Sequence, residues 1–330
     1  MVREQTEGEP ERRAAVLAGL RAYQVAERVP RLPEMPVVAR AGRAVLRDYG
    51  GAGLPAVFVP SLINPPLVLD LSESASLLRW LAGRGVRPLL VDWGHPSESL
   101  FETGEDRNIA DHITSYLLPL LQQLGEPAHL VGYCLGGTMA LAAAMQAPLL
   151  SLTLIAAPWH FAGFGQAARA EIGALWAGAK PTSKQLGLVP IEVLQSGFWR
   201  LDPARTVAKY EAFGRMDPAG EAACSFVALE DWANAGAPLT YAAGRELFED
   251  LIGDDVTGRG RWHGVDPARL AVPTLEFVSS NDRIVPAASS ACLPNARTLG
   301  LGHVGMIVGG RAKEQLWEPL AAMLSRSQQS

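Results

Sequence analysis

The sequence contains few cysteines, and none of them has the spacing of a disulfide framework or a zinc site. Its three cysteines, Cys134, Cys224 and Cys292, form no C-x-x-C pair. Disulfide-stabilised secreted domains and zinc-binding domains depend on such spacings. We therefore expect no bound metal and no cofactor, and we expect the chain to lie in the reducing cytoplasm.

An excess of positive charge and a long apolar run are also missing. The formal net charge is −5, so the chain has no general basic field for a phosphate backbone, and nucleic acid is not an expected partner. The N-terminal stretch MVREQTEGEPERR is polar, and no uncharged run reaches the roughly 20 residues that a membrane helix needs. We expect no integral membrane segment, and only peripheral contact with a membrane or granule.

Apolar residues are abundant and regularly placed. They make up 48% of the 330 residues, enough for one large core with an inserted lobe. Short apolar runs, which predict strands, alternate with longer helical patterns. The predicted strands are 56–59, 88–91, 129–133, 152–156, 274–278 and a weaker one at 296–299, and the predicted helices are 70–82, 105–124, 135–147 and 312–324. This alternation predicts an α/β fold with a mostly parallel sheet covered by helices on both faces.

Two segments lack this alternation of strands and helices: the N-terminal residues 1–40 and the stretch 159–266. Residues 1–40 are expected to form an N-terminal extension, disordered to about residue 10 and then helical over 14–29. Residues 159–266 read as a mainly helical cap without a buried strand, inserted between two parts of the core, 41–158 and 267–330. The cap holds five of the eight tryptophans, which either line an apolar acyl pocket or pack the lobe: Trp159, Trp176, Trp199, Trp232 and Trp262. We take Trp159, His160 and Trp232 as candidate pocket residues.

A glycine-rich turn follows the predicted strand 129–133. The stretch Gly132-Tyr-Cys134-Leu-Gly136 has the form G-x-C-x-G and leads into an alanine-rich helix. Such a strand-turn-helix holds a nucleophile on a sharp turn at a helix N-terminus, which favours a thiolate. A lone cysteine is usually structural, but in this context Cys134 is predicted to be the nucleophile.

A thiol nucleophile needs a base, and the base needs a carboxylate that orients it. Asp282 follows the strand 274–278 in the stretch N-D-R-I-V-P, and His303 lies in a glycine-rich loop after the last strand. Taken alone, Asp282 could cap a turn and His303 could be a surface residue. Together with Cys134 they occur in the chain order nucleophile, acid, histidine, which predicts the catalytic triad of an α/β-hydrolase fold.

Two backbone N–H groups are needed to stabilise the oxyanion of the reaction. One is expected from Leu135, which directly follows the nucleophile. The second is expected from Ser61 or Leu62, in the loop after the strand 56–59, although Ser61 could instead cap a turn.

Several segments resemble the polyhydroxyalkanoate synthase family. They are V-P-S-L-I-N-P-P-L-V-L-D-L (59–71), L-L-R-W-L (77–81), V-D-W-G-H-P (91–96), G-Y-C-L-G-G-T (132–138), N-D-R-I-V-P and G-H-V-G. The resemblance spans about 55–160 and 270–325. It differs at Arg283, where the family typically has a second histidine, and in the cap.

The resemblance implies an acyltransferase that moves hydroxyacyl groups from an acyl-coenzyme A thioester through Cys134. The short N-terminus resembles that of synthases that act with a second subunit, so a second synthase subunit and a polyester granule are expected partners. Two alternatives stay open. One is a thioesterase or ester hydrolase with the same triad, and the other is a catalytically silent polymer-binding or partner subunit.

Overall fold

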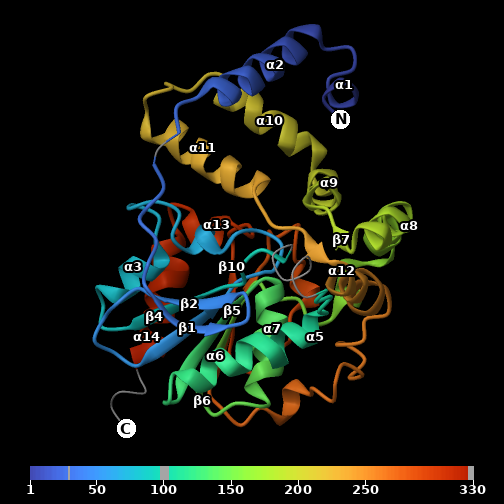
Figure 1. Ribbon diagram of the computed structural model, residues 1–330. Coiled ribbons are helices and arrows are strands. Elements are labelled where there is room, and N and C mark those ends of the chain that lie inside the picture. The colour runs from blue at the N-terminus through green and yellow to red at the C-terminus, as the bar shows by residue number, and fades with distance from the viewer. Residues whose placement is uncertain (29, 97–103, 326–330) are drawn as a thin grey trace.

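The computed structural model describes residues 1–28, 30–96 and 104–325, and a central sheet organises them (Figure 1). Within this part of the chain eight strands lie in the order β1-β2-β4-β3-β5-β6-β9-β10. The strands are β1 (Val37–Ala41), β2 (Ala44–Asp48), β3 (Pro55–Val59), β4 (Arg87–Asp92), β5 (Ala128–Tyr133), β6 (Leu149–Ile155), β9 (Thr274–Ser279) and β10 (Ala296–Leu299). From β4 to β10 all neighbours are parallel, so the predicted fold class is confirmed.

The edge hairpin of β1 and β2 is missing from the prediction. It pairs antiparallel, and only two of the five β1 side chains are buried, so neither strand forms a continuous apolar run. Gly42, at φ 56°, lies in the tight turn that joins the two strands, a conformation that glycine adopts without strain. Because β1 begins at Val37, the sheet takes in residues that we had expected to belong to the N-terminal extension.

Helices cover both faces of the sheet. Alternate side chains of β3 serve the two faces: Val57 and Val59 pack in one hydrophobic cluster, Ala56 and Phe58 in the other. The first cluster contains α5 (Ile109–His112), η2 (Ile113–Leu117), α6 (Leu118–Gln123) and α7 (Leu135–Ala144). The second contains η1 (Pro66–Leu69), α3 (Leu77–Ala82), α13 (Gly305–Val308), η7 (Lys313–Trp317) and α14 (Glu318–Ser325).

Two helices begin later than predicted, because capping residues set their first turns. The predicted helix 70–82 starts at Leu77, where the Ser76 hydroxyl accepts a hydrogen bond from the Arg79 N–H. The predicted helix 105–124 starts at Ile109, where Asn108 forms a capping box with Asp111. A side chain that satisfies the free N–H groups of a first turn fixes the start of the helix.

The chain leaves the sheet between β6 and β9. Within 159–266, the segment predicted as a cap, lie η3 (Phe161–Phe164), α8 (Gln166–Leu186), α9 (Ile191–Leu201), α10 (Pro203–Phe213), α11 (Glu221–Asn234), α12 (Tyr241–Arg245) and η4 (Glu246–Gly253). The two-residue strands β7 (Leu188–Val189) and β8 (Leu239–Thr240) pair antiparallel, and Val189 and Leu239 are buried. Strands this short give no sequence pattern. The short turns η5 (Pro267–Arg269) and η6 (Ala287–Ser289) flank β9.

The N-terminal segment forms two helices that lie on the cap, above the sheet (Figure 1). They are α1 (Val2–Gln5) and α2 (Pro10–Val25), so both the expected disorder before residue 10 and the single helix over 14–29 are wrong as far as the structure describes these residues; Val29 lies outside them. Pro10 suits a first helical turn because it lacks an N–H. Ala26 is extended and ends α2.

Helix α2 packs tightly against α10 at Gly19. A Cβ atom at Gly19 would overlap the carbonyl oxygen of Tyr210. The Tyr23 hydroxyl donates to Asp231 of α11 at 2.6 Å. The N-terminal segment is therefore packed against the same two helices that cover the candidate site. Among the described residues, no helix is both long and apolar enough to cross a membrane.

Candidate active site

Cys134 occupies a strained turn between β5 and α7. Its φ and ψ are 56° and −134°, a conformation that costs a non-glycine residue energy and must be held by its surroundings. Its N–H donates to the Ile155 carbonyl at 3.0 Å, and its own carbonyl accepts from the Gly137 N–H at 2.8 Å. A Cβ at Gly136 would overlap the Val59 carbonyl, so the turn requires glycine there.

His303 and Asp282 meet in a buried hydrogen bond. His303 Nδ1 lies 2.6 Å from Asp282 Oδ2, and both residues are buried. The other carboxylate oxygen, Oδ1, accepts from the N–H groups of Ile284 at 2.7 Å and Val285 at 2.9 Å. Because an ionised carboxylate only accepts, this arrangement assigns the proton to Nδ1 and leaves Nε2 as the basic nitrogen.

The surroundings of His303 favour its protonated form. Burial alone lowers its pKa, but the charges of Cys134 and Asp282, and hydrogen bonds with both, raise the pKa to about 10. The Tyr133 ring stacks on the imidazole at a centroid distance of 5.0 Å. Cys134 lines the same cavity as His303, so the structure brings Cys134, Asp282 and His303 together.

Two of the predicted oxyanion residues, Leu135 and Ser61, lie near Cys134. Leu135 is the first residue of α7, and Ser61 lines the same cavity as Cys134. Ser61 Oγ accepts a hydrogen bond from the Ile63 N–H at 3.2 Å, so the Ser61 side chain caps a local turn. This contact leaves the backbone N–H of Ser61 free to act as an oxyanion donor. Among the described residues, the N–H groups of Leu135, Ser61 and Leu62 have no backbone acceptor, as an oxyanion donor requires.

A cavity of about 170 Å³ connects Cys134 and His303 to the cap. Its walls near the sheet are mainly apolar, and its roof comes from α9, α10 and α11. The lining residues are Pro60, Ser61, Asn64, Pro65, Val68, Tyr133, Cys134, Gln195, Thr206, Lys209, Glu230, Trp232, Ala233, Asn234, Ile284, His303 and Val304. Trp232, a candidate pocket residue, lines this cavity, and its indole N–H donates to the Pro65 carbonyl at 2.8 Å.

Trp159 and His160 lie outside this cavity, so their prediction as pocket residues is wrong for it. Trp159 is buried against the Trp262 ring at 6.1 Å. The His160 N–H donates to the Ser289 carbonyl at 3.0 Å. Both residues follow β6 closely, and their hydrogen bonds and ring contacts pack the base of the cap.

A charged pair in the roof was missed from the sequence. Lys209 Nζ lies 2.7 Å from both carboxylate oxygens of Glu230, and the Tyr210 hydroxyl donates to Glu230 at 2.8 Å. Glu230 is 5% exposed. Lys209 and Glu230 come from different helices, and no spacing within the sequence indicates that they meet. Across residues 1–28, 30–96 and 104–325, no group of three or more His, Cys, Asp or Glu residues could hold a metal ion.

Comparison with curated proteins finds poly(3-hydroxyalkanoate) polymerase subunits. The Haloferax mediterranei protein is 27% identical over 280 residues, covering 80% of this chain and 57% of its own length. The Synechocystis protein is 27% identical over 304 residues, covering 83% of this chain and 78% of its own. The chain spans only 57% and 64% of the Haloferax and Haloarcula marismortui relatives.

Comparison with solved structures supports the fold. MenH from S. aureus matches with a TM-score of 0.54 and 16% identity, over 86% of this chain and 98% of its own. A monoacylglycerol lipase from Paleococcus ferrophilus matches with a TM-score of 0.51 and 14% identity, over 86% and 99%. Residues 51–312, most of the sequence and all strands from β3 to β10, match a family described as the alpha/beta hydrolase family. The chain belongs to the alpha/beta hydrolase family.

Proposed function

We propose that this protein is a polyhydroxyalkanoate synthase-like acyltransferase that takes hydroxyacyl groups from coenzyme A thioesters onto Cys134. The observation that carries the proposal is a cysteine on a strained turn, in one cavity with a histidine that is bonded to a buried aspartate. The similarity to poly(3-hydroxyalkanoate) polymerase subunits supports the substrate class.

In the first half of the reaction, the Cys134 thiol gives its proton to His303 Nε2 and attacks the thioester carbonyl carbon. The negative charge that develops on the carbonyl oxygen is stabilised by the N–H groups of Leu135 and of Ser61 or Leu62. When this intermediate collapses, the bond between the carbonyl carbon and the coenzyme A sulfur breaks. His303 then returns the proton to the departing thiolate, which leaves as free coenzyme A.

In the second half, the hydroxyl of another hydroxyacyl unit replaces the thiol. His303 takes the hydroxyl proton, the alkoxide attacks the acyl-Cys134 carbonyl, and the proton passes to the Cys134 sulfur as it leaves. The product is an ester one unit longer. A thioester intermediate suits this exchange because it exchanges with another thioester at little cost and stays reactive toward a hydroxyl.

Chain growth rather than hydrolysis requires that water be kept from the acyl-enzyme. The cavity that contains Cys134 is also lined by Pro65, Val68, Trp232 and Ile284. These side chains offer water no hydrogen-bonding group, because the Trp232 N–H is already bonded to the Pro65 carbonyl. We propose this apolar lining as the means of exclusion. A second synthase subunit, a polyester granule and a cytoplasmic location remain predictions that accompany the proposal.

The proposal is tested with purified protein and 3-hydroxybutyryl-coenzyme A, with Cys134→Ala as the control. We expect release of free coenzyme A, a mass increase on Cys134 and formation of oligomers, all absent in the control. Free 3-hydroxybutyrate without oligomers would identify a hydrolase. No release of coenzyme A, with several acyl lengths and with a synthase partner subunit added, would support a catalytically silent protein.

A further inference from the structure

Trp93 connects the loop after β3, which contains the predicted oxyanion donors Ser61 and Leu62, to the interior of the protein. It directly follows β4 and is 5% exposed. Its indole N–H donates to the carbonyl oxygen of Pro60 at 3.1 Å, in a buried hydrogen bond that joins positions 33 residues apart. Pro60 and Ser61 both line the cavity that holds Cys134. Trp93 itself does not line the cavity, so it acts on the Pro60 carbonyl from behind the cavity wall.

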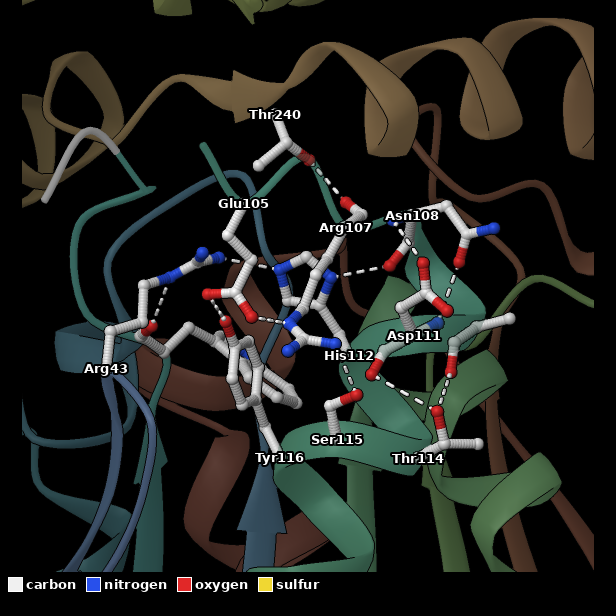
Figure 2. Close-up of polar contacts among 12 residues, drawn as sticks. Arg43, Glu105, Arg107, Asn108, Asp111, His112, Thr114, Ser115, Tyr116 and Thr240 are labelled. Atoms are coloured by element: carbon white, nitrogen blue, oxygen red, sulfur yellow. Dashed lines mark hydrogen bonds and ion pairs between the residues drawn. The ribbon is translucent and has the colours of Figure 1, made fainter. Parts of the chain in front are cut away.

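A partly buried polar cluster contacts both the backbone and the ring of Trp93. Arg43 Nε donates to the Trp93 carbonyl at 3.0 Å, and Arg43 Nη2 lies 2.6 Å from His112 Nε2. Figure 2 shows this contact and the one from His112 Nδ1 to the Asn108 carbonyl, which is 2.6 Å long. The His112 and Trp93 rings form a T-shaped contact, with their centroids 6.0 Å apart.

His112 is uncharged in this cluster, and its neutral state determines which ring nitrogen donates and which accepts a hydrogen bond. Burial first, and then the charge of Arg43, lower the pKa of His112 to about 3. The neutral ring donates from Nδ1 to Asn108 and accepts at Nε2 from Arg43. Tyr116 closes the cluster, with Arg43 lying over its ring at 5.2 Å. Trp93 is thus packed between fixed groups, and its indole N–H has a fixed direction.

We infer that Trp93 is a positioning residue for the oxyanion donor of the proposed acyl transfer, and this inference rests on the proposed function. The Pro60 carbonyl and the Ser61 N–H belong to one planar peptide group. A hydrogen bond that fixes the carbonyl therefore also fixes the direction of the N–H. The start of α7 limits this peptide group as well, because a Cβ at Gly136 would lie 2.5 Å from the Pro60 oxygen.

Loss of the indole N–H leaves a buried carbonyl without its donor, and the peptide group then turns to find another. An N–H donor displaced by a fraction of an ångström stabilises the oxyanion much less, because this stabilisation depends on a donor that is correctly placed before the reaction begins. Trp93 therefore acts on reactions that form an oxyanion. It does not act on reactions of the Cys134 thiol that form none.

The test replaces Trp93 with 3-benzothienylalanine, which keeps the ring size and substitutes sulfur for the N–H. The matched control places the same amino acid at Trp317, whose buried indole N–H donates to the Ile307 carbonyl at 2.9 Å in the C-terminal part of the chain. Two rates are measured for each protein: acylation of Cys134 by p-nitrophenyl butyrate, which forms an oxyanion, and alkylation of Cys134 by iodoacetamide, which forms none.

We expect the Trp93 variant to be acylated 10- to 100-fold more slowly while its alkylation rate stays within twofold, and the Trp317 variant to change neither. Equal slowing of both reactions, or no slowing of acylation, would overturn the inference. Because the nitrophenyl ester needs no coenzyme A site, wild-type protein that reacts with it but not with 3-hydroxybutyryl-coenzyme A would refute only the proposed function. Wild-type protein in which Cys134 reacts with neither acyl donor would refute both.

Discussion

Asp282 shows how the orientation of one carboxylate decides which histidine tautomer is present. Its Oδ1 accepts two backbone N–H groups, and its Oδ2 faces His303 Nδ1. In Asp282→Asn the amide oxygen will keep the place that accepts the two N–H groups, so the amide nitrogen will face Nδ1. Nδ1 must then accept, the proton moves to Nε2, and Cys134 loses its base.

We therefore expect Asp282→Asn to slow acylation of Cys134 by on the order of 10³- to 10⁴-fold. Coenzyme A release in single turnovers measures this rate, and Asp254→Asn, a surface substitution in the cap, is the control. A loss below tenfold would show that His303 does not depend on Asp282 for its tautomer.

The Lys209–Glu230 pair gives a second prediction at the scale of residues. Lys209→Met leaves the buried Glu230 carboxylate with the Tyr210 hydroxyl as its remaining side-chain partner. Removing one partner of a buried pair costs about 3–5 kcal/mol, and the partial exposure of Lys209 reduces our expectation to about 2 kcal/mol. Urea unfolding measures the loss.

Adding Glu230→Gln to Lys209→Met removes the uncompensated charge and should restore about 1 kcal/mol. If the double variant is less stable than Lys209→Met by the full cost of Glu230→Gln alone, the two side chains do not interact energetically. This comparison separates the pair from a general effect of changing α10.

Sequence reasoning located the candidate residues that lie in local motifs. Cys134, Asp282 and His303 each lie in a turn directly after a strand, and parallel strands bring such turns to one edge of the sheet. Lys209 and Glu230 have no such motif, and although Trp93 directly follows β4, its position there does not indicate its contact with Pro60. Their partners are set by how the cap and the interior pack, and one sequence contains no signal for contacts between distant elements.

At the scale of elements, the contact between α2 and α10 leaves no space for a side chain at Gly19. In Gly19→Ala the new methyl group would overlap the Tyr210 carbonyl, so the two helices must separate. Overpacking typically costs about 1–3 kcal/mol, and this exceeds the gain of about 1 kcal/mol from replacing a helical glycine with alanine.

We expect Gly19→Ala to lower the free energy of unfolding by about 1 kcal/mol net, and to slow acylation because Lys209 and Tyr210 lie on the displaced helix. Chemical denaturation and coenzyme A release provide the two readouts. Gly178→Ala, at an exposed position of α8 where a Cβ atom would meet no neighbouring group within 4 Å, is the control with the same added methyl group. Stability equal to or above wild type would mean that α2 does not pack closely on α10.

The elements themselves were predicted unevenly, for a physical reason. Strands buried on both faces, such as β3 and β5, form continuous apolar runs that are easily recognised. The hairpin of β1 and β2 is half exposed and lies at the sheet edge, so its sequence resembles a loop. β7 and β8 contain two residues each and are defined only by their pairing.

At the scale of the whole molecule, histidines determine how stability changes with pH. Burial lowers the pKa of His112 to about 3 and that of His129 to about 4, below the value of about 6.5 expected in the unfolded chain. Unfolding then takes up protons between about pH 4 and 6.5, so stability falls as pH falls through this range. His303 has the opposite shift, to about 10, so its contribution is complete below about pH 6.5 and is lost as pH rises toward 10.

We expect the free energy of unfolding to be greatest near pH 6.5, and to change on either side by up to about 1.4 kcal/mol per pH unit for each proton exchanged. Urea unfolding at pH 4.5, 6.5 and 9 measures this curve. His112→Asn should flatten the acid side, and His303→Gln should flatten the alkaline side. Unchanged slopes in either variant would show that other groups cause the dependence.

The packing of α2 on the cap also has a consequence for synthesis of the protein. Helix α2 ends roughly 180 residues before α10 begins, which at 5–20 residues per second corresponds to a delay on the order of 10 to 40 s on the ribosome. During this time α2 lacks its partner α10, while β3, β4 and β5 are already available to pair. The strands can thus assemble before α2 docks, and closing the roof over Cys134 becomes a late event in folding.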